Sequence, residues 1–341
     1  MNSHDFPQPQ LSTQRYLDAI TASLTALAQC DAVACGGSAA AAPTVGDDTL
    51  LTLYTLDGIN EVLEWNNEGA AADEIACIWL SLLRWLRTVH HINPDAAPFA
   101  LDRPLDHALD VASHGGPNTV IEQALRTGEM QMIDKNINAD SQDAGSLLRA
   151  VALGFLPVED VQTVALLSAR STALTHGNHQ VIFASVAVSL MVRAALGLAT
   201  ASTESAPESG VFRASLEHVS AWLETLPLPQ FPGTADDVMG VCQQALTGQI
   251  SESSHDGAVA SLGHVLAVLL NNDSVADARN LLSQVTVPMD YKAHEFALIG
   301  ALSGAAYGQD VLENSNQLAP SAQVSIELVL DNWAQQLALA Q

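Results

Sequence analysis

Two adjacent aspartates, Asp47 and Asp48, stand directly before an apolar run whose spacing predicts a helix over 50–65. Successive residues at a helix start point about 100° apart around the axis, so the two carboxylates can bind one cation. Magnesium favours such hard oxygen ligands, usually one or two carboxylates completed by waters. The same Asp-Asp-Thr sequence also serves as a helix cap, because short polar side chains accept hydrogen bonds from free N–H groups. The residues alone leave both interpretations open.

Histidines are a second set of candidates, for proton transfer or metal binding. His176 and His179, in "THGNHQ", have an i, i+3 spacing that suits acid–base residues or a zinc site at a helix start. A helix cap or a partly buried polar contact is the commoner explanation of such a pair. His90, His91 and His114 have no third ligand nearby in sequence and are interpreted in the same way.

The sequence lacks the motifs of several common enzyme classes. It contains no Gly-x-Ser-x-Gly, no P-loop, no dinucleotide-binding fingerprint and no His-Glu-x-x-His.

Helices must position these candidates, because helical spacing of apolar residues dominates and strand-like alternation is nearly absent. Apolar residues make up 48% of the chain and aromatic residues only 5%, so the core must consist mainly of Ala, Leu and Val. Segments 199–210 and 227–237 predict loops between helices of the same composition, so we predict one domain. The predicted helices cover 16–28, 50–65, 71–89, 119–127, 144–156, 158–175, 180–198, 212–225, 234–247, 256–270, 274–284 and 294–307.

The charge and the apolar segments exclude several classes of partner. The chain has 12 basic and 38 acidic residues, and its net charge of −26 repels nucleic-acid phosphates and anionic lipids. The longest apolar stretch, 181–192, is too short to span a bilayer, and no secretion signal is visible. The cysteines form no CxxC pair and predict buried free thiols: Cys30, Cys35, Cys77 and Cys242. We expect a cytoplasmic protein that binds neither nucleic acid nor membrane.

Six segments, in order along the chain, resemble the signatures of the ADP-ribosylglycohydrolase family. "RYLDAITASLTALAQCDAVACGGS" is similar to the family's first helix and the turn that follows it, with Asp31 in that turn. Gly46-Asp47-Asp48-Thr49 resembles the family's Thr-Asp-Asp-Thr. The other four are "SHGGPNTVIEQALRTG", "ADSQDAGSLLRAVALGFL", "ALTHGNHQVIFASVAVSLMVRAAL" and "EFALIGALSGAAYG".

The resemblance implies an all-α fold, a single compact multi-helix domain over 15–338 that follows an irregular or disordered stretch, 1–14. It implies a polar cleft that binds two Mg²⁺ ions and ADP-ribose, either free or attached to a protein. The bond between the ribose C1″ and the protein side chain is then hydrolysed. The metal ligands would be Asp47, Asp48 and Asp290, and the catalytic residues Asp48 and Asp31, with Asp31 supporting the cluster. The ADP-ribose pocket would be lined by Asn118, Ser141, Gly145, Arg149 and His176.

Some positions depart from the family pattern. Gly46 replaces the metal-binding threonine, and Gln142 and Asp143 replace the lysine and first glycine of the phosphate-binding loop. An acid there repels a diphosphate and crowds a backbone that must approach it closely. The distal metal aspartates fall at Lys292 and His294, so their carboxylates are lost.

These departures support two hypotheses. One is a hydrolase with an altered magnesium site. The other is a catalytically inactive member that acts as an ADP-ribose-binding or protein-interaction module. Both require that the segment after Gly46 and the segment before Phe296 meet in one hollow, whereas an unrelated helical protein would not bring them together.

Overall fold

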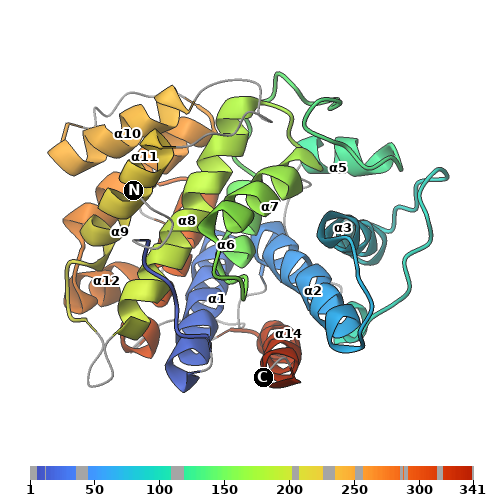
Figure 1. Cartoon of the computed structure of the whole chain (residues 1–341), viewed down its shortest axis with the longest axis horizontal. Coiled ribbons are helices and arrows are strands. Elements are labelled where there is room, and N and C mark those ends of the chain that lie inside the picture. Colours follow the sequence, from blue (N-terminus) through green and yellow to red (C-terminus); the bar gives the residue numbers. More distant parts are fainter. Residues whose placement is uncertain are drawn as a thin grey trace.

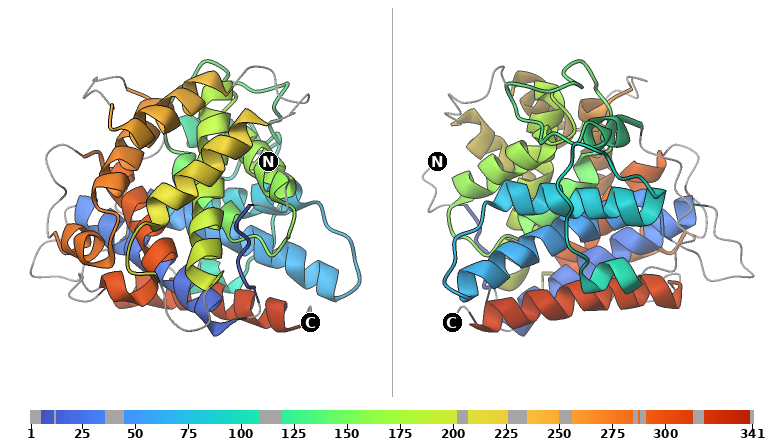
Figure 2. Two further views of the ribbon diagram at one scale, coloured as in Figure 1. Left: turned by 60° about the vertical axis from the view of Figure 1, so that its left-hand side comes forward. Right: turned by 90° about the vertical axis from the view of Figure 1, so that its right-hand side faces the viewer.

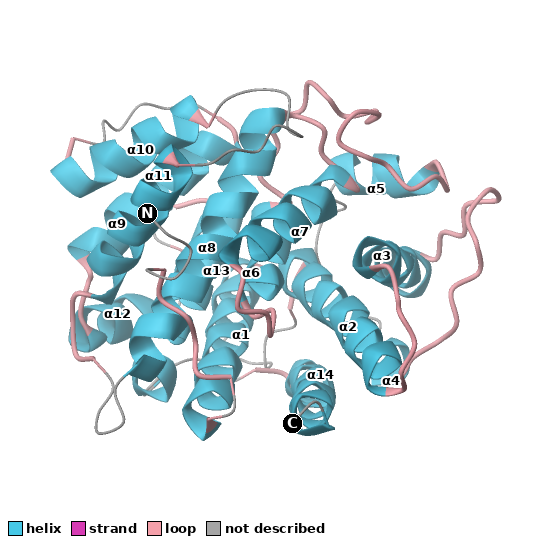
Figure 3. Cartoon of the chain, viewed as in Figure 1, coloured by secondary structure: helices cyan, strands magenta, loops and turns pink. Residues whose placement is uncertain are grey.

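Helices form all the regular structure of the described residues, as the computed structural model shows (Figure 3). The described residues are 6–11, 13–35, 45–108, 119–201, 207–225, 235–249, 256–284, 287, 291–312 and 318–339. The helices are α1 (Gln14–Ala34), α2 (Asp47–Asn67), α3 (Glu74–His90), α4 (Pro104–Ala108), α5 (Thr119–Arg126), α6 (Leu147–Gly154), α7 (Val161–Ala173), α8 (His179–Ala201), α9 (Val211–Glu224), α10 (Asp236–Thr247), α11 (Ala258–Asn271), α12 (Val275–Leu282), α13 (Ala293–Tyr307), the 3₁₀-helix η2 (Gly308–Leu312) and α14 (Pro320–Leu339). The all-α prediction is confirmed.

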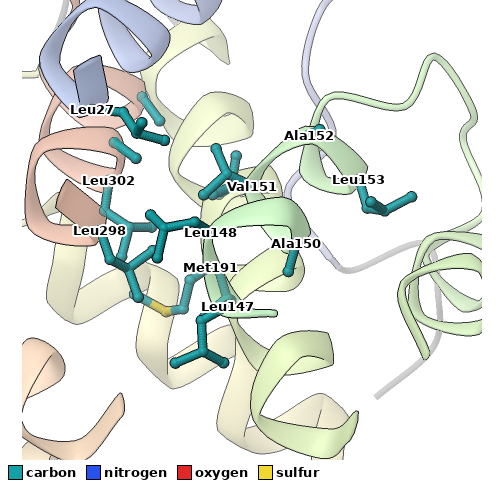
Figure 4. Packing of buried hydrophobic residues seen from close by; sticks show 14 of the residues in the cluster. Leu27, Leu147, Leu148, Ala150, Val151, Ala152, Leu153, Met191, Leu298 and Leu302 are labelled. Carbon is teal, nitrogen blue, oxygen red and sulfur yellow. The ribbon is translucent and has the colours of Figure 1, made fainter. Parts of the chain in front are cut away.

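Helix α8 lies in the middle of the assembly, with α6, α7, α9 and α13 packed around it (Figures 1 and 2). It is longer than the predicted 180–198, and length and composition alone would let it cross a membrane. However, 94% of its most apolar window is buried inside the protein, as in the core helix of a folded domain. Figure 4 shows Met191 of α8 beside Leu148 and Val151 of α6 and Leu298 of α13. Small and branched aliphatic side chains therefore fill this core.

Helices α1 and α13 approach so closely that two glycines are required on α13. A Cβ at Gly300 would lie 2.6 Å from the Ala26 carbonyl oxygen, and one at Gly304 would lie 2.5 Å from the Ala22 carbonyl carbon. The pairing is antiparallel, because the higher number on α13 meets the lower number on α1. Continued by one turn, this register brings the start of α13 level with Asp31 of α1.

We expect Gly304→Ala to lower the free energy of unfolding by about 1–3 kcal/mol, because the methyl group must push backbone atoms apart. Gly240→Ala on α10 is the matched control, since a Cβ there has nothing within 4 Å. Alanine favours helix, so the control should stabilise the protein by up to about 1 kcal/mol. Urea unfolding measures both, and equal changes would contradict the close approach of α1 and α13.

A buried ion-pair network fastens α3 to α2 and α4, on the side where α14 runs along the molecule (Figure 2). Arg84 of α3 binds Asp57 at 2.6 Å and Asp106 at 3.0 Å. Arg103, just ahead of α4, binds the same Asp57 at 3.0 Å and Glu64 at 2.7 Å. On α2 these pairs lie at its middle, Asp57, and near the end far from Asp47, at Glu64.

The four cysteines are free thiols, and three of them are buried: Cys30, Cys77 and Cys242. Cys35 is half-buried. The prediction of free thiols is therefore confirmed, although Cys35 is less buried than expected.

Candidate functional site

Asp31, in the last turns of α1, caps helix α2 from outside. Its carboxylate is buried and accepts hydrogen bonds from the Gly46 N–H at 2.8 Å, the Thr49 N–H at 3.2 Å and the Thr49 hydroxyl. Helix α2 begins at Asp47, three residues earlier than predicted, with Gly46 as its N-cap. Capping is thus the role of Asp31, and Asp47 and Asp48 are the first two residues of the helix.

Gly46 has a steric reason to be glycine. A Cβ at this position would lie 2.7 Å from a carboxylate oxygen of Asp31 and 2.8 Å from the Cys35 sulfur. The family's threonine therefore cannot be accommodated unless Asp31 moves. The glycine at position 46 and the capping role of Asp31 are therefore linked, because the Asp31 carboxylate occupies the space that a threonine side chain would need.

Asp47 is buried, with 6% of its surface exposed, and neither of its carboxylate oxygens accepts a hydrogen bond from the described residues. Burial first, and then the charges of Asp31 and Glu122, raise its pKa to about 7. A carboxylate without donors in such a place is either protonated or neutralised by a cation.

His90, the last residue of α3, stands between two acids. Its Nε2 lies 3.4 Å from Asp47 Oδ2, without the alignment of a hydrogen bond, and its Nδ1 lies 3.5 Å from Glu122 Oε1. Burial is the largest cause that lowers its pKa, so the neutral ring is favoured. The Trp85 ring packs edge-on against it, with centroids 4.6 Å apart. No local sequence pattern indicates that α3 brings His90 to Asp47.

Asp48 is half-buried beside further acids. Burial, followed by the charges of Asp31, Asp47 and Asp143, raises its pKa well above the usual value. Asp143 belongs to the segment that the resemblance assigns to phosphate binding. Asp143 of segment 141–145 is therefore near enough to the start of α2 for its charge to act on Asp48.

The segment 141–145 folds back on itself. The Ser141 hydroxyl accepts the Asp143 N–H at 3.3 Å, and the buried Gly145 donates its N–H to Asp143 Oδ1 at 2.9 Å. His176 Nε2 lies 3.2 Å from the same oxygen. The predicted residues Ser141, Gly145 and His176 are thus brought together, with Asp143 as their common partner.

Arg149 supports this group from behind. Only 1% of it is exposed, and its guanidinium donates to the Ser171 carbonyl at 3.4 Å and to the Thr175 hydroxyl. That hydroxyl in turn lies 2.9 Å from His176 Nδ1. Burial lowers the pKa of Arg149 to about 10. In this arrangement Arg149 acts on the site through Thr175 and His176.

The distal segment presents a lysine and a histidine that already have partners. Lys292 Nζ pairs with Asp256 at 2.9 Å, and His294 Nε2 lies 3.0 Å from the Ser261 hydroxyl. The Glu295 carboxylate accepts the Lys292 N–H at 3.0 Å and so caps α13. Burial lowers the pKa of His294, whereas the charge of Glu295 and, to a lesser extent, that of Asp143 raise it. Asp143 therefore acts on both the start of α2 and the start of α13.

Two predicted residues, Asn118 and Asp290, lie outside the described residues. Within the part of the chain that is described, no three His, Cys, Asp or Glu side chains are grouped as a metal centre requires. The oxygens of Asp47 accept no aligned hydrogen bond from the described residues, and with the neighbouring Asp48 they suit one Mg²⁺, which commonly takes one or two carboxylates and keeps several waters. The described residues thus fit one magnesium ion and do not provide for two.

Comparison with known proteins identifies the family and the fold. The sequence model of the ADP-ribosylglycohydrolase family matches residues 12–338. A solved structure described as an ADP-ribosylglycohydrolase-related protein complex has the same fold, with a TM-score of 0.55 and 17% identity over 96% of this chain and 98% of that one. No curated protein matches the sequence. Because the family model covers nearly the whole chain, this protein belongs to the ADP-ribosylglycohydrolase family.

Proposed function

We propose that this chain binds ADP-ribose attached to a protein side chain and hydrolyses the bond at the ribose, with one Mg²⁺ held by Asp47 and Asp48. The Asp47 carboxylate carries the proposal, because its two buried oxygens accept no aligned hydrogen bond from the described residues, and the charges of further acids act on them. Family membership supplies the reaction class. Asp290 is a further proposed ligand.

When bound, the magnesium ion would act as a Lewis acid that orients the ribose hydroxyls and a water molecule. The protein residues then have separate roles. Asp31 fixes the first turn of α2, so that Asp47 and Asp48 keep their places. Asp48, which is half-buried and has a raised pKa, is the proposed general base for the attacking water. The ADP-ribose pocket would include Asn118, Ser141, Gly145, Arg149 and His176, with Arg149 acting from behind.

Release of ADP-ribose from peptides modified on arginine or serine tests this proposal. We expect release that requires magnesium and falls by about 100-fold or more in Asp48→Asn, because a general base is lost. The matched control is Asp236→Asn, an exposed acid in the first turn of α10, which should leave the rate unchanged. No release at high enzyme concentration, with or without magnesium, would contradict the hydrolase proposal.

The second candidate is an inactive member that binds ADP-ribose or a protein partner. It is favoured by one observation: Lys292 and His294 stand where the family's distal aspartates are expected, and both are engaged by neighbouring side chains. Calorimetry with ADP-ribose separates the two candidates. Binding that does not depend on magnesium, without release from peptides, supports the binding role.

A further inference from the structure

His90 Nε2 and the Asp47 carboxylate are buried polar groups that lie side by side without a hydrogen bond. Nε2 is 3.4 Å from Asp47 Oδ2, and neither this nitrogen nor either Asp47 oxygen has an aligned partner among the described residues. Helix α3 packs against α2 and α5, and it ends at His90, so that the ring reaches the first residue of α2 (Figure 1). Buried polar atoms are normally paired, so these three require a partner that binds both side chains at once.

Glu122 of α5 favours one form of the His90 ring. Its Oε1 lies 3.5 Å from His90 Nδ1, and its Oε2 accepts hydrogen bonds from Arg126 at 2.9 and 3.2 Å. A carboxylate facing Nδ1 favours a proton on that nitrogen, which leaves the lone pair of the neutral ring on Nε2, the side of Asp47. Histidines that bind a metal commonly have a carboxylate on the other ring nitrogen in this way. The Trp85 ring, with its centroid 4.6 Å from that of His90, packs edge-on against the imidazole.

The separation of 3.4 Å decides between the partners that can bridge the two side chains. A water molecule at about 2.8 Å from both atoms would have to accommodate an angle of about 75° between them, which is too narrow for its two hydrogens. An ion at about 2.05 Å from both would subtend about 112°, close to the tetrahedral angle of zinc sites. Neighbouring ligands of an octahedral magnesium ion lie only about 2.9 Å apart. The geometry thus matches a four-coordinate ion.

We infer that His90 Nε2 is a ligand of the ion that Asp47 binds, and that this position prefers a divalent transition metal of the zinc type to magnesium. The inference rests on the proposed function, because it assumes that Asp47 binds a cation. It keeps the substrate and the reaction of that proposal and adds a nitrogen ligand, while magnesium can still occupy the position through oxygen ligands alone. Imidazole nitrogen is a good ligand for zinc, whereas magnesium selects oxygen.

Calorimetry with Zn²⁺ and with Mg²⁺, each added to the metal-free protein, tests the inference. In His90→Asn the shorter side chain does not reach the Nε2 position. We expect this variant to bind Zn²⁺ at least about tenfold more weakly than the wild type. Its affinity for Mg²⁺ should stay within about threefold, because magnesium does not use the nitrogen. The wild type should bind Zn²⁺ more tightly than Mg²⁺.

Two variants identify the binding event. His91→Asn is the matched control, because His91 is the exposed neighbour of His90 and its φ of 55° suits asparagine. This control should bind both ions as the wild type does. Asp47→Asn removes the other ligand and should abolish the Zn²⁺ binding that His90→Asn weakens.

Glu122→Gln provides a second measurement if His90→Asn folds poorly. It keeps both ligands and removes the negative charge that favours the proton on Nδ1, so the affinity for Zn²⁺ should fall by about tenfold. Co²⁺ gives an independent readout, since its visible absorption intensifies when it leaves six-coordinate water for a four-coordinate site. The wild type and His91→Asn should show this intense absorption, and His90→Asn should lose it.

The possible failures can be told apart. The inference alone fails if Zn²⁺ binding depends on Asp47 but is equally tight in His90→Asn and the wild type, because the ion is then bound without the nitrogen. If neither ion binds the wild type, or if Asp47→Asn binds both ions as the wild type does, the metal site of the proposed function fails together with the inference. Release of ADP-ribose from modified peptides tests the reaction itself separately.

Discussion

Replacing Asp47 with asparagine should stabilise the folded protein by about 4 kcal/mol at pH 8.5 and by less than half as much, about 1.7 kcal/mol, at pH 5. Burial and the charges of Asp31 and Glu122 raise the pKa of Asp47 in the folded state from 3.8 to about 7. Between these values the folded protein keeps a proton that the unfolded chain has released. The stability of the wild type therefore falls as the pH rises through this interval and stays lower above it. Asparagine is neutral at every pH, so the variant does not lose this stability as the pH rises.

Urea unfolding at pH 5 and pH 8.5 measures the effect. Asp236→Asn is again the matched control, because Asp236 is the first residue of α10 as Asp47 is of α2, but is exposed. The control should change the free energy of unfolding by less than about 0.5 kcal/mol at both pH values. A gain from Asp47→Asn that is the same at both pH values would contradict the raised pKa. Magnesium at pH 8.5 should raise the melting temperature of the wild type but not that of Asp47→Asn.

Only part of the surroundings of the Asp47 carboxylate could be predicted from the sequence. Adjacent acids before an apolar run indicate a helix start, and the family signatures add Asp31. The cap that joins Asp31 to Gly46 spans 15 residues of chain and depends on how α1 ends, so no local pattern reveals it. His90 reaches Asp47 only because α3 packs along α2, and helical periodicity does not fix that orientation.

Segment 141–145 was likewise only partly predictable from the sequence. An acid where the family has a glycine suggests repulsion of phosphate, and this follows from the resemblance. That Asp143 takes the Gly145 N–H and is held by His176, 33 residues away, requires the tertiary structure. The roles of Asn118 and Asp290 stay predictions.

Helix α14 is not among the predicted helices, although its sequence has the helical spacing of buried residues. Its buried residues recur at helical spacing, at Ser325, Val329, Trp333 and Gln336. The predicted helices stop at residue 307, close to the last family signature, which ends at Gly308. Periodicity can identify such a helix, but its position beside α2 depends on contacts such as Asn60 with the Val329 carbonyl, 269 residues apart.

Replacing Arg84 with leucine should destabilise the protein by about 3–5 kcal/mol, because it leaves buried carboxylates without their cation. Arg84 is 1% exposed, and the side chains of Asp57 and Asp106 are 5% and 3% exposed. Asp57 keeps Arg103 as a cationic partner, whereas Asp106 keeps two neutral donors, the Tyr54 hydroxyl at 2.9 Å and the Arg103 N–H at 2.7 Å. The loss should therefore fall mainly on Asp106.

Arg87→Leu is the matched control, since it makes the same change on the same helix at an ion pair with Asp102, whose side chain is 51% exposed. Water screens that pair, so its loss should cost no more than about 1 kcal/mol. In the double variant Arg84→Leu, Asp106→Asn the uncompensated charge is removed, and the free energy of unfolding should recover part of the loss. Urea unfolding at pH 7 of the wild type, the two single variants and the double variant measures these free energies. If Arg84→Leu is no worse than Arg87→Leu, the buried network is not what holds α3 to α2 and α4.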